Sequence, residues 1–496
     1  MYKLGFDNEK YIALQSERIR ERIDQFGGKL YLEFGGKLFD DYHASRVLPG
    51  FAPDSKIRML IQLKDQAEIV LAINANDIEK NKVRGDLGIT YDLDTLRLID
   101  AFRNFGLYVG SVVLTRWQDQ PAAVKFQKRL ESLGVKVYRH YPIEGYPSDI
   151  DRIVSDEGYG KNDYIETTRS LVVITAPGPG SGKMATCLSQ LYHDNLRGRR
   201  SGYAKFETFP VWNLPLKHPV NVAYEAATAD LNDMNMIDPY HLEAYGTTAV
   251  NYNRDVEIFP VVTAMFTRIY GECPYQSPTD MGVNMAGNCI LDDEAVRSAA
   301  NMEIVRRYYH ALCDMRKDGG DSHDVEKLKL IMQSAGILPE YRSVAEAARK
   351  KSSETAGKPA VAIELPDGRT VTGKTSRLLG AVSAALLNAL KLLANIDDRI
   401  NLISPEILEP ITSLKVGALG SSNPRLHPNE VLIALSVCAL TDPIAKQAME
   451  QLPRLRRSEL HSTVILSEGD EHTLKKLGIY LTSDPAYESK RLYHGC

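Results

Sequence analysis

The stretch LVVITAPGPGSGKMATCLSQLYHD, Leu171 to Asp194, joins a strand, a loop and a helix in a single unit. Its first residues form an apolar run that predicts a strand over 170–176. A glycine-rich loop with one lysine follows, and the amphipathic pattern after it predicts a helix over 184–198. Strand, glycine loop and helix in this order are typical of a parallel α/β sheet.

The same alternation of strand and helix patterns extends over residues 1–225. Helices are predicted over 93–106 and 121–134, and both patterns end on glycine, as helix C-termini prefer. The alternation predicts a largely parallel, doubly wound α/β sheet. Two of the early runs lie only a few residues apart, which leaves a hairpin as an alternative for that pair. The further predicted strands cover 29–34, 57–63, 68–73, 108–115, 135–140 and 203–211.

Two further regions follow along the chain. Residues 226–345 are predicted to be mostly helical, with helices over 294–320 and 324–336 and long polar connections. Residues 346–496 are predicted to form a smaller α/β domain. Its predicted elements are a hairpin about Asp367-Gly368, helices over 378–396 and 429–452, and strands over 462–467 and 476–484.

The composition is that of a globular protein, with 44% hydrophobic and 25% charged residues. The net charge of −4 gives no basic field that would attract nucleic acid or an anionic membrane. The six cysteines are scattered without a CxxC pair, which indicates reduced thiols. The apolar stretch 378–396 contains Asn388 and Lys391 and is better explained as a buried helix than as a membrane span. We therefore expect a soluble cytoplasmic protein.

The glycine loop of the opening stretch predicts an anion site. Backbone N–H groups bind phosphate where several converge, and glycine permits the dihedral angles this requires. The predicted cofactor-binding residues are therefore Gly178, Gly180, Ser181, Gly182 and Lys183. The alternative is a tight turn whose glycines serve only packing.

The same loop departs from the phosphate-loop pattern GxxxxGK[ST] at two positions. Pro177 stands where a glycine is expected, and Met184 stands where a hydroxyl would hold Mg²⁺. The candidate cofactor of this loop is a nucleotide such as ATP. Because Met184 provides no hydroxyl, its binding should depend only weakly on Mg²⁺, or the Mg²⁺ should be held by carboxylates elsewhere. No metal ligand set is predicted, because HExxH is absent and the HxE at His241 lacks a following PCxxC.

A second stretch, GRTVTGKT from Gly368 to Thr375, fits the phosphate-loop pattern letter for letter. Its middle residues Thr370, Val371 and Thr372 are β-branched and resist the dihedral angles of a phosphate loop. We therefore predict a hairpin here and no nucleotide site.

Polar residues at the carboxyl ends of strands give the other candidates, because ligands of doubly wound sheets bind there. Gly35, Gly36 and Lys37 follow the first predicted strand as a second glycine–lysine loop, which could equally be an ordinary turn. Asp280, in the polar segment 275–288, and His43 are the candidates for proton transfer. An ordinary capping loop is the alternative for 275–288. Further candidates follow later predicted strands: Asn76, Arg84, Arg116 and His140. In the 294–320 helix, Arg306 and Arg307 are expected on a solvated face.

Three stretches resemble one bacterial family of proteins of unknown function that are about as long as this chain. They are APGPGSGKMATCLSQLYHD, LPDGRTVTGKTSRLLGAVSAALLNALK and LHSTVILSEGDEHTLKKLGI, and the resemblance extends over essentially the whole chain. It implies a Rossmann-like N-terminal part, a helical middle and a C-terminal part of cytidine-deaminase-like topology. Some members carry an ATP-dependent peptidase label, which the missing zinc motif does not support.

Two functions follow as hypotheses. The first is an enzyme that holds the phosphate of a small molecule or nucleotide with the 178–183 loop and transfers a proton with Asp280 or His43. The second is a non-catalytic nucleotide-binding or assembly protein whose apolar C-terminal helices form a homo-oligomer.

Overall fold

The computed structural model describes residues 3–39, 41–84, 87–231, 233–318 and 322–488. The chain falls into two compact units, Leu4–Ala299 and a second one that begins at Ala300. The predicted boundary near residue 225 lies inside the first unit. Helix α13 (Asp293–Asp318) crosses from one unit to the other.

A seven-stranded sheet forms the centre of the first unit, and every neighbouring pair in it is parallel. The strand order is β11-β8-β1-β7-β2-β5-β6, so β7, the strand of the opening stretch, lies in the middle. This confirms the predicted parallel α/β architecture. The strands are β1 (Leu30–Phe34), β2 (Ala67–Asn74), β5 (Tyr108–Thr115), β6 (Lys136–Arg139), β7 (Leu171–Thr175), β8 (Gly202–Phe206) and β11 (Gly282–Val283).

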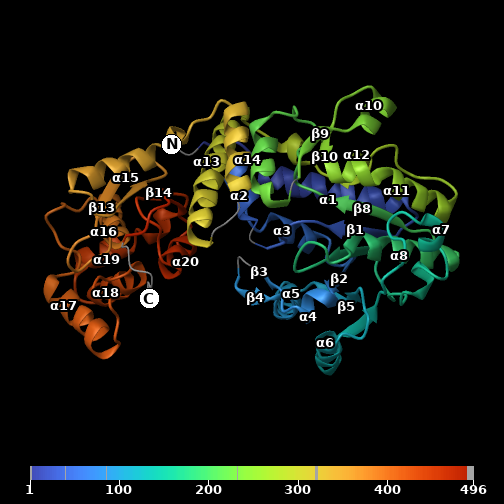
Figure 1. Cartoon of the computed structure of the whole chain (residues 1–496), viewed down its shortest axis with the longest axis horizontal. Coiled ribbons are helices and arrows are strands. Elements are labelled where there is room, and N and C mark those ends of the chain that lie inside the picture. Colours follow the sequence, from blue (N-terminus) through green and yellow to red (C-terminus); the bar gives the residue numbers. More distant parts are fainter. Residues whose placement is uncertain (1–2, 40, 85–86, 232, 319–321, 489–496) are drawn as a thin grey trace. The chain divides into compact units, whose positions relative to one another are not determined.

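Helices cover both faces of this sheet (Figure 1). Tyr31 of β1 donates a hydrogen bond of 2.9 Å to Asp194 of α8, which places α8 on the face of Tyr31. Phe34, three residues along the same strand, points to the opposite face. Its ring stacks on Phe206, and Lys56 of α3 lies over that ring, so α3 covers the second face. The helices of the unit before α13 are α1 (Asn8–Gln25), α2 (Tyr42–Val47), α3 (Ser55–Gln62), α4 (Ala75–Glu79), α5 (Tyr91–Asn104), α6 (Pro121–Ser132), α7 (Ile150–Ile153), α8 (Lys183–Leu196), α9 (Pro219–Ala227), α10 (Pro239–Tyr245), α11 (Asn253–Tyr270) and α12 (Pro278–Met281).

The strand predicted over 57–63 is wrong, because this segment is helix α3. Its Met, Leu, Gln, Lys and Arg side chains are not branched at Cβ and favour a helix, and Ile57 and Leu60 bury one helical face. The alternative hairpin with 68–73 is also wrong, since β2 pairs with β5 and β7. The strand predicted over 203–211 ends at Phe206, and Pro210 lacks the N–H that a longer strand would need. Two antiparallel pairs complete the strands of the unit: β3 (Val83–Arg84) with β4 (Ile89–Thr90), and β9 (Asn235–Ile237) with β10 (Val250–Tyr252).

The second unit contains a four-stranded sheet of order β13-β12-β14-β15. Strand β12 is antiparallel to β13 and β14, whereas β14 and β15 are parallel. The predicted hairpin at GRTVTGKT is confirmed, with Gly368 at φ +86° in its turn. The strands are β12 (Ala360–Glu364), β13 (Thr370–Lys374), β14 (Glu459–Ser462) and β15 (Tyr480–Ser483).

Helix α16 (Ala381–Ala394) is the predicted apolar helix and is buried against this sheet. The single helix predicted over 429–452 is wrong, because it divides into α18 (Pro428–Cys438) and α19 (Pro443–Met449). Asp442 accepts a hydrogen bond from the N–H of Ile444, and Pro443 starts the new helix, which together account for the break. No helix in the described ranges is both long and apolar enough to cross a membrane. The remaining helices are α14 (Ser322–Ser334), α15 (Ser343–Glu354), α17 (Pro405–Ser413) and α20 (Glu468–Lys476).

A buried ion network joins α13, the start of α15 and β14 within the second unit. Arg342 is fully buried and donates to the carbonyls of Leu460 and Tyr480 at 2.8 and 3.0 Å, and also to Glu459. Arg306 donates to the same carboxylate at 2.8 Å. The predicted solvated position of Arg306 is therefore wrong, because this side chain supplies a counter-charge to a buried glutamate.

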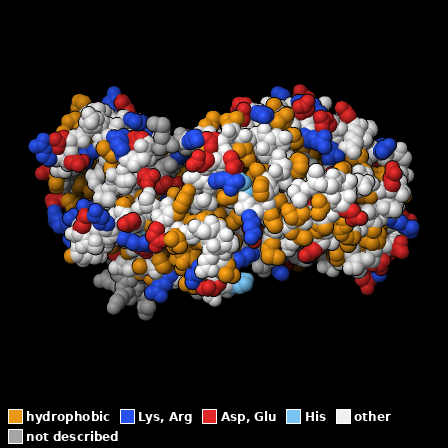
Figure 2. Space-filling model, turned by 90° about the horizontal axis from the view of Figure 1, so that it is seen from above, with side chains coloured by type: hydrophobic (Ala, Val, Ile, Leu, Met, Phe, Trp, Pro, Cys, Tyr) orange, Lys and Arg blue, Asp and Glu red, His pale blue; other side chains and the backbone are white. Residues whose placement is uncertain are grey.

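Charges of both signs are interspersed on the face shown in Figure 2, and neither sign collects over one part of it. This distribution agrees with the small net charge of −4.

Candidate functional site

The 178–183 loop lies at the carboxyl edge of the seven-stranded sheet, between the end of β7 and the start of α8. Strand β1 runs beside β7 in register, with Glu33 opposite Ile174, so Gly35, Gly36 and Lys37 leave the sheet at the same edge. The next long helix after β1, α3, covers one face and the helix after β7 covers the other. The connections that follow these two neighbouring strands therefore run to opposite faces of the sheet. In open α/β sheets, ligands bind in the crevice at the carboxyl edge where the connections diverge in this way.

The end of the loop and the first turn of α8 contain backbone N–H groups that have no hydrogen-bond acceptor among the described residues. Gly180 and Gly182 have φ of +72° and +83°, a region that favours glycine. Gly182 is the N-cap of α8 and has no side chain to accept from the first turn. Among the residues that the structure describes, none accepts a hydrogen bond from the N–H groups of Lys183 to Ala185. These groups are therefore available to an anion.

Side chains from neighbouring strands hold the loop carbonyls in place. Thr115, at the end of β5, donates to the carbonyl of Ser181 at 2.8 Å, and Asn74, at the end of β2, lies 3.5 Å from that of Gly180. Ser181 donates to the carbonyl of Gly178 at 2.6 Å. A Cβ atom on Gly178 would lie 2.3 Å from the hydroxyl oxygen of Tyr91, so a larger residue there would have to displace the Tyr91 ring. The loop conformation is thus fixed before any ligand arrives.

The first turn of α8 offers no hydroxyl for a metal ion. Thr186 is fully buried and donates its hydroxyl to the carbonyl of Gly182 at 2.9 Å. Lys183, the first residue of the helix, is partly exposed beside the loop.

Three charged side chains gather at the carboxyl end of β8, the strand on the other side of β1. Lys205 forms ion pairs with Asp255 of α11 and, at 2.8 Å, with Glu207. Burial, together with the nearby Asp255, raises the pKa of Glu207 to about 7 in spite of Lys205. Burial alone would lower the pKa of Lys205, but the two carboxylates raise it, so this amine is an ammonium ion. A carboxyl group with this pKa can exchange a proton near neutral pH.

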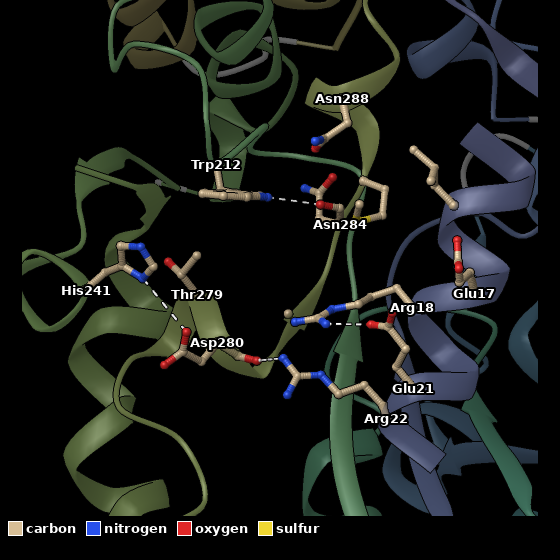
Figure 3. A pocket seen from close by; sticks show the side chains of 13 residues that line it. Glu17, Arg18, Glu21, Arg22, Trp212, His241, Thr279, Asp280, Asn284 and Asn288 are labelled. Atoms are coloured by element: carbon tan, nitrogen blue, oxygen red, sulfur yellow. Dashed lines mark hydrogen bonds and ion pairs between the residues drawn. The ribbon is translucent and has the colours of Figure 1, made fainter. Parts of the chain in front are cut away.

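A pocket of about 440 Å³ lies beside β11, the edge strand of the sheet. Figure 3 shows Arg18 and Arg22 projecting from α1 toward the part of the wall that carries Asp280. His241 of α10 lies on that same wall, with its Nδ1 3.9 Å from Asp280 Oδ1 and 3.2 Å from the hydroxyl of Ser277.

Asp280 has a structural role in addition to lining this pocket. Its backbone N–H and Oδ2 close a capping box with Ser277 at the start of α12. Oδ2 also accepts from the N–H of Gln276 at 3.1 Å and from the hydroxyl of Tyr245 at 2.9 Å. Asn251, at the middle of β10, donates to Thr279 at 3.2 Å, which ties the predicted polar segment 275–288 to that strand.

His43 lies elsewhere, on α2. Its ring packs edge-on against Phe209 and Tyr224, with centroids 5.3 and 5.5 Å apart. It is not among the described residues that line the pocket of Asp280, so the structure does not bring the two proton-transfer candidates together there. The catalytic roles of both stay predictions.

The other strand-end candidates make internal contacts. Arg84 pairs with Asp94 at 2.8 Å, and Asn76 accepts from Gln120 at 2.8 Å. Burial lowers the pKa of His140 to about 3, so this ring is neutral. Arg116 is exposed after β5.

Two family models match consecutive parts of the chain. The N-terminal domain of unknown function DUF1846 matches residues 4–336, and its C-terminal counterpart matches residues 340–493. The chain belongs to this family. UPF0371 proteins of Streptococcus pyogenes, Streptococcus sanguinis and Streptococcus thermophilus are each 58% identical to it over 493 residues, which is 99% of this chain and 100% of each relative. The predicted family resemblance is confirmed, and the names of these relatives give no activity.

Sequence reasoning missed two groups of residues in this DUF1846 chain. Lys205 and Glu207 lie inside the strand predicted over 203–211, and they come to a carboxyl end only because β8 ends at Phe206. Arg18 and Arg22 belong to an ordinary amphipathic helix pattern, and no local feature connects them with Asp280 more than 250 residues along the chain.

Proposed function

We propose that this chain binds the phosphate group of a small molecule or nucleotide at the carboxyl edge of its parallel sheet, as in a Rossmann-like fold, and acts on it as an enzyme. The observation that carries the proposal is the set of N–H groups from Lys183 to Ala185 without internal acceptors. A helix N-terminus carries about half a positive charge, and Lys183 adds a full one.

The reacting part of the ligand would extend toward Glu207. Strands β7 and β8 flank β1 on its two sides, and neighbouring strands are about 4.8 Å apart, so the two strand ends are about 10 Å apart. That span suits a phosphorylated sugar or a nucleotide. In this position Glu207 would transfer the proton, and Lys205 would hold negative charge as it develops. Asp280 and His43 lie outside this arrangement.

The loop proposal predicts a ligand response that depends on Lys183. We expect at least one of a panel of nucleotides, dinucleotides, sugar phosphates and inorganic phosphate to raise the melting temperature. At about 100 times its dissociation constant a ligand adds roughly 2.7 kcal/mol of stability. Lys183→Ala should weaken binding about tenfold, because it removes one charge-assisted contact to phosphate.

Lys374→Ala is the matched control, since Lys374 is the lysine of the hairpin that imitates a phosphate loop. It should leave the response unchanged. Omitting Mg²⁺ should also change the response little, because Met184 and the engaged Thr186 provide no hydroxyl ligand. A panel without any stabilising phosphate compound would disprove the proposed site.

The second prediction concerns the titration of Glu207. We expect a carboxyl group that protonates near pH 7 in infrared difference spectra of the unliganded protein, and Glu207→Gln should remove it. A raised pKa means that the folded state favours the protonated form. This group therefore stabilises the fold most below its ordinary pKa of 4.5, and the contribution is lost as pH rises through 7. Identical spectra for wild type and variant would refute the assignment.

The assembly alternative is favoured by exposed apolar side chains in the second unit. Ile433 and Val437 on α18 are 65% and 59% exposed, and Leu440, just beyond that helix, is 82% exposed. Turnover of a bound phosphate compound in a metabolite-depletion screen would support the enzyme. Saturable binding without turnover, with a ligand-dependent change of mass in solution, would support the homo-oligomeric binding protein.

A further inference from the structure

The pocket beside β11 contains a buried cation without a matching anion. Arg22 is 7% exposed, and its guanidinium donates to the side chain of Gln25 and to the main-chain carbonyl of Asp280. Its buried Nε–H has no acceptor, and burial lowers the pKa of Arg22 although the carboxylates of Asp280 and Glu21 act against this at longer range. The ring of Tyr275, 5.4 Å away, offers a cation–π contact, which is weaker than the desolvation cost of a buried charge. This arrangement calls for an anion.

The mouth of the pocket sets the kind of anion. Glu17 and Glu21 line it together with Arg18, and Arg18 is paired with Glu21 at 2.6 Å. Counting Asp280, three carboxylates face two guanidinium groups, so a doubly charged phosphate would be repelled. A single carboxylate matches the planar guanidinium of Arg22 and adds only one negative charge.

The opposite wall supplies a place for a positive group. Oδ2 of Asp280 accepts the three internal hydrogen bonds, which leaves Oδ1, facing His241, as the oxygen for a ligand. Figure 3 shows Arg22 and Asp280 approaching each other from opposite walls of the pocket, with Arg22 donating to the backbone of Asp280. A carboxylate and an ammonium group held by these two residues would therefore be close together, as they are in an α-amino acid.

We infer that this pocket binds a small zwitterion of the amino-acid class, with its carboxylate on Arg22 and its ammonium group on Asp280. A volume of about 440 Å³ is ample for a free amino acid, and the apolar parts of Trp212 and Met285 are available to its side chain. The site is separate from the glycine loop, because the two have no residue in common.

Calorimetric titration with each standard L-amino acid tests the inference. We expect saturable binding of at least one, and binding of its des-amino acid and of its decarboxylated amine should each be at least tenfold weaker. Arg22→Met should weaken binding of the amino acid at least tenfold. Arg20→Met is the matched control, because Arg20 is exposed on the same helix and does not line the pocket.

Asp280→Asn keeps the inference testable if Arg22→Met fails to fold. It should weaken binding of the amino acid and leave binding of the des-amino acid unchanged, because only the amino acid has an ammonium group. Lys183→Ala should leave amino-acid binding unchanged, which separates this site from the proposed phosphate loop. The inference is overturned if no amino acid binds, if Arg22→Met binds as wild type does, or if inorganic phosphate binds through Arg22 instead.

Discussion

Replacing Arg342 by alanine is expected to lower the free energy of unfolding of the second unit by about 3–5 kcal/mol. The side chain is fully buried, and it satisfies Glu459, the hydroxyl of Thr482 and two main-chain carbonyls. Removing it takes one donor from each of these acceptors and creates a cavity, while Arg306 remains as a donor and counter-charge for Glu459.

Urea denaturation followed by circular dichroism measures this loss. Arg349→Ala is the control, because Arg349 pairs with Asp484 while nearly half exposed, and such pairs contribute about 1 kcal/mol or less. Burial alone would raise the pKa of Glu459, but Arg306 and Arg342 lower it. The difference in free energy of unfolding between wild type and Arg342→Ala should therefore be fully present above pH 4.5 and decrease as pH falls through the lowered pKa of Glu459. A loss below 1 kcal/mol for Arg342→Ala would contradict the network.

Replacing Gly373 by valine is expected to destabilise the same unit by about 3 kcal/mol. A Cβ atom at this position would lie 2.2 Å from the backbone nitrogen of Ala385 and 2.7 Å from the carbonyl oxygen of Ala381. Both atoms belong to the backbone of α16, so the helix has to move away from β13. The glycine that completes the phosphate-loop pattern thus serves the close approach of a helix to a strand.

Gly417→Ala is the control for this substitution, since nothing lies within 4 Å of a Cβ atom there. Its midpoint in urea should stay close to that of wild type. Gly373→Ala, the milder change, should leave the response to phosphate compounds unchanged. A variant at Gly373 that keeps full stability but loses a nucleotide response would show that the hairpin is a ligand site after all.

The parts of the fold that followed from sequence are those in which local pattern and tertiary environment agree. Every residue of β7 is buried, and a continuous apolar run is the sequence expected for a strand that is buried on both faces. The 57–63 run is apolar as well, but α3 buries only one of its faces, and a short apolar run does not distinguish these cases.

The candidate sites were predictable to different degrees for a similar reason. Gly178 to Lys183 are contiguous, so one segment carries the whole pattern. Arg306 looks like any arginine on a helix, and only its contact with Glu459, 153 positions away, makes it a buried counter-ion. The pocket of Arg22 likewise depends on long-range packing that no single segment encodes.

The two outer strands of the large sheet bear on how this protein behaves at high concentration. An open strand edge is a template on which another chain can add, and long apolar edges lead to aggregation. Strand β11 has only two residues, and β6 begins and ends with the cations Lys136 and Arg139. Like charges would meet if two β6 edges approached each other. Growth of the sheet from molecule to molecule is therefore blocked at both sides, and the concentrated protein is protected against polymerising through its main sheet.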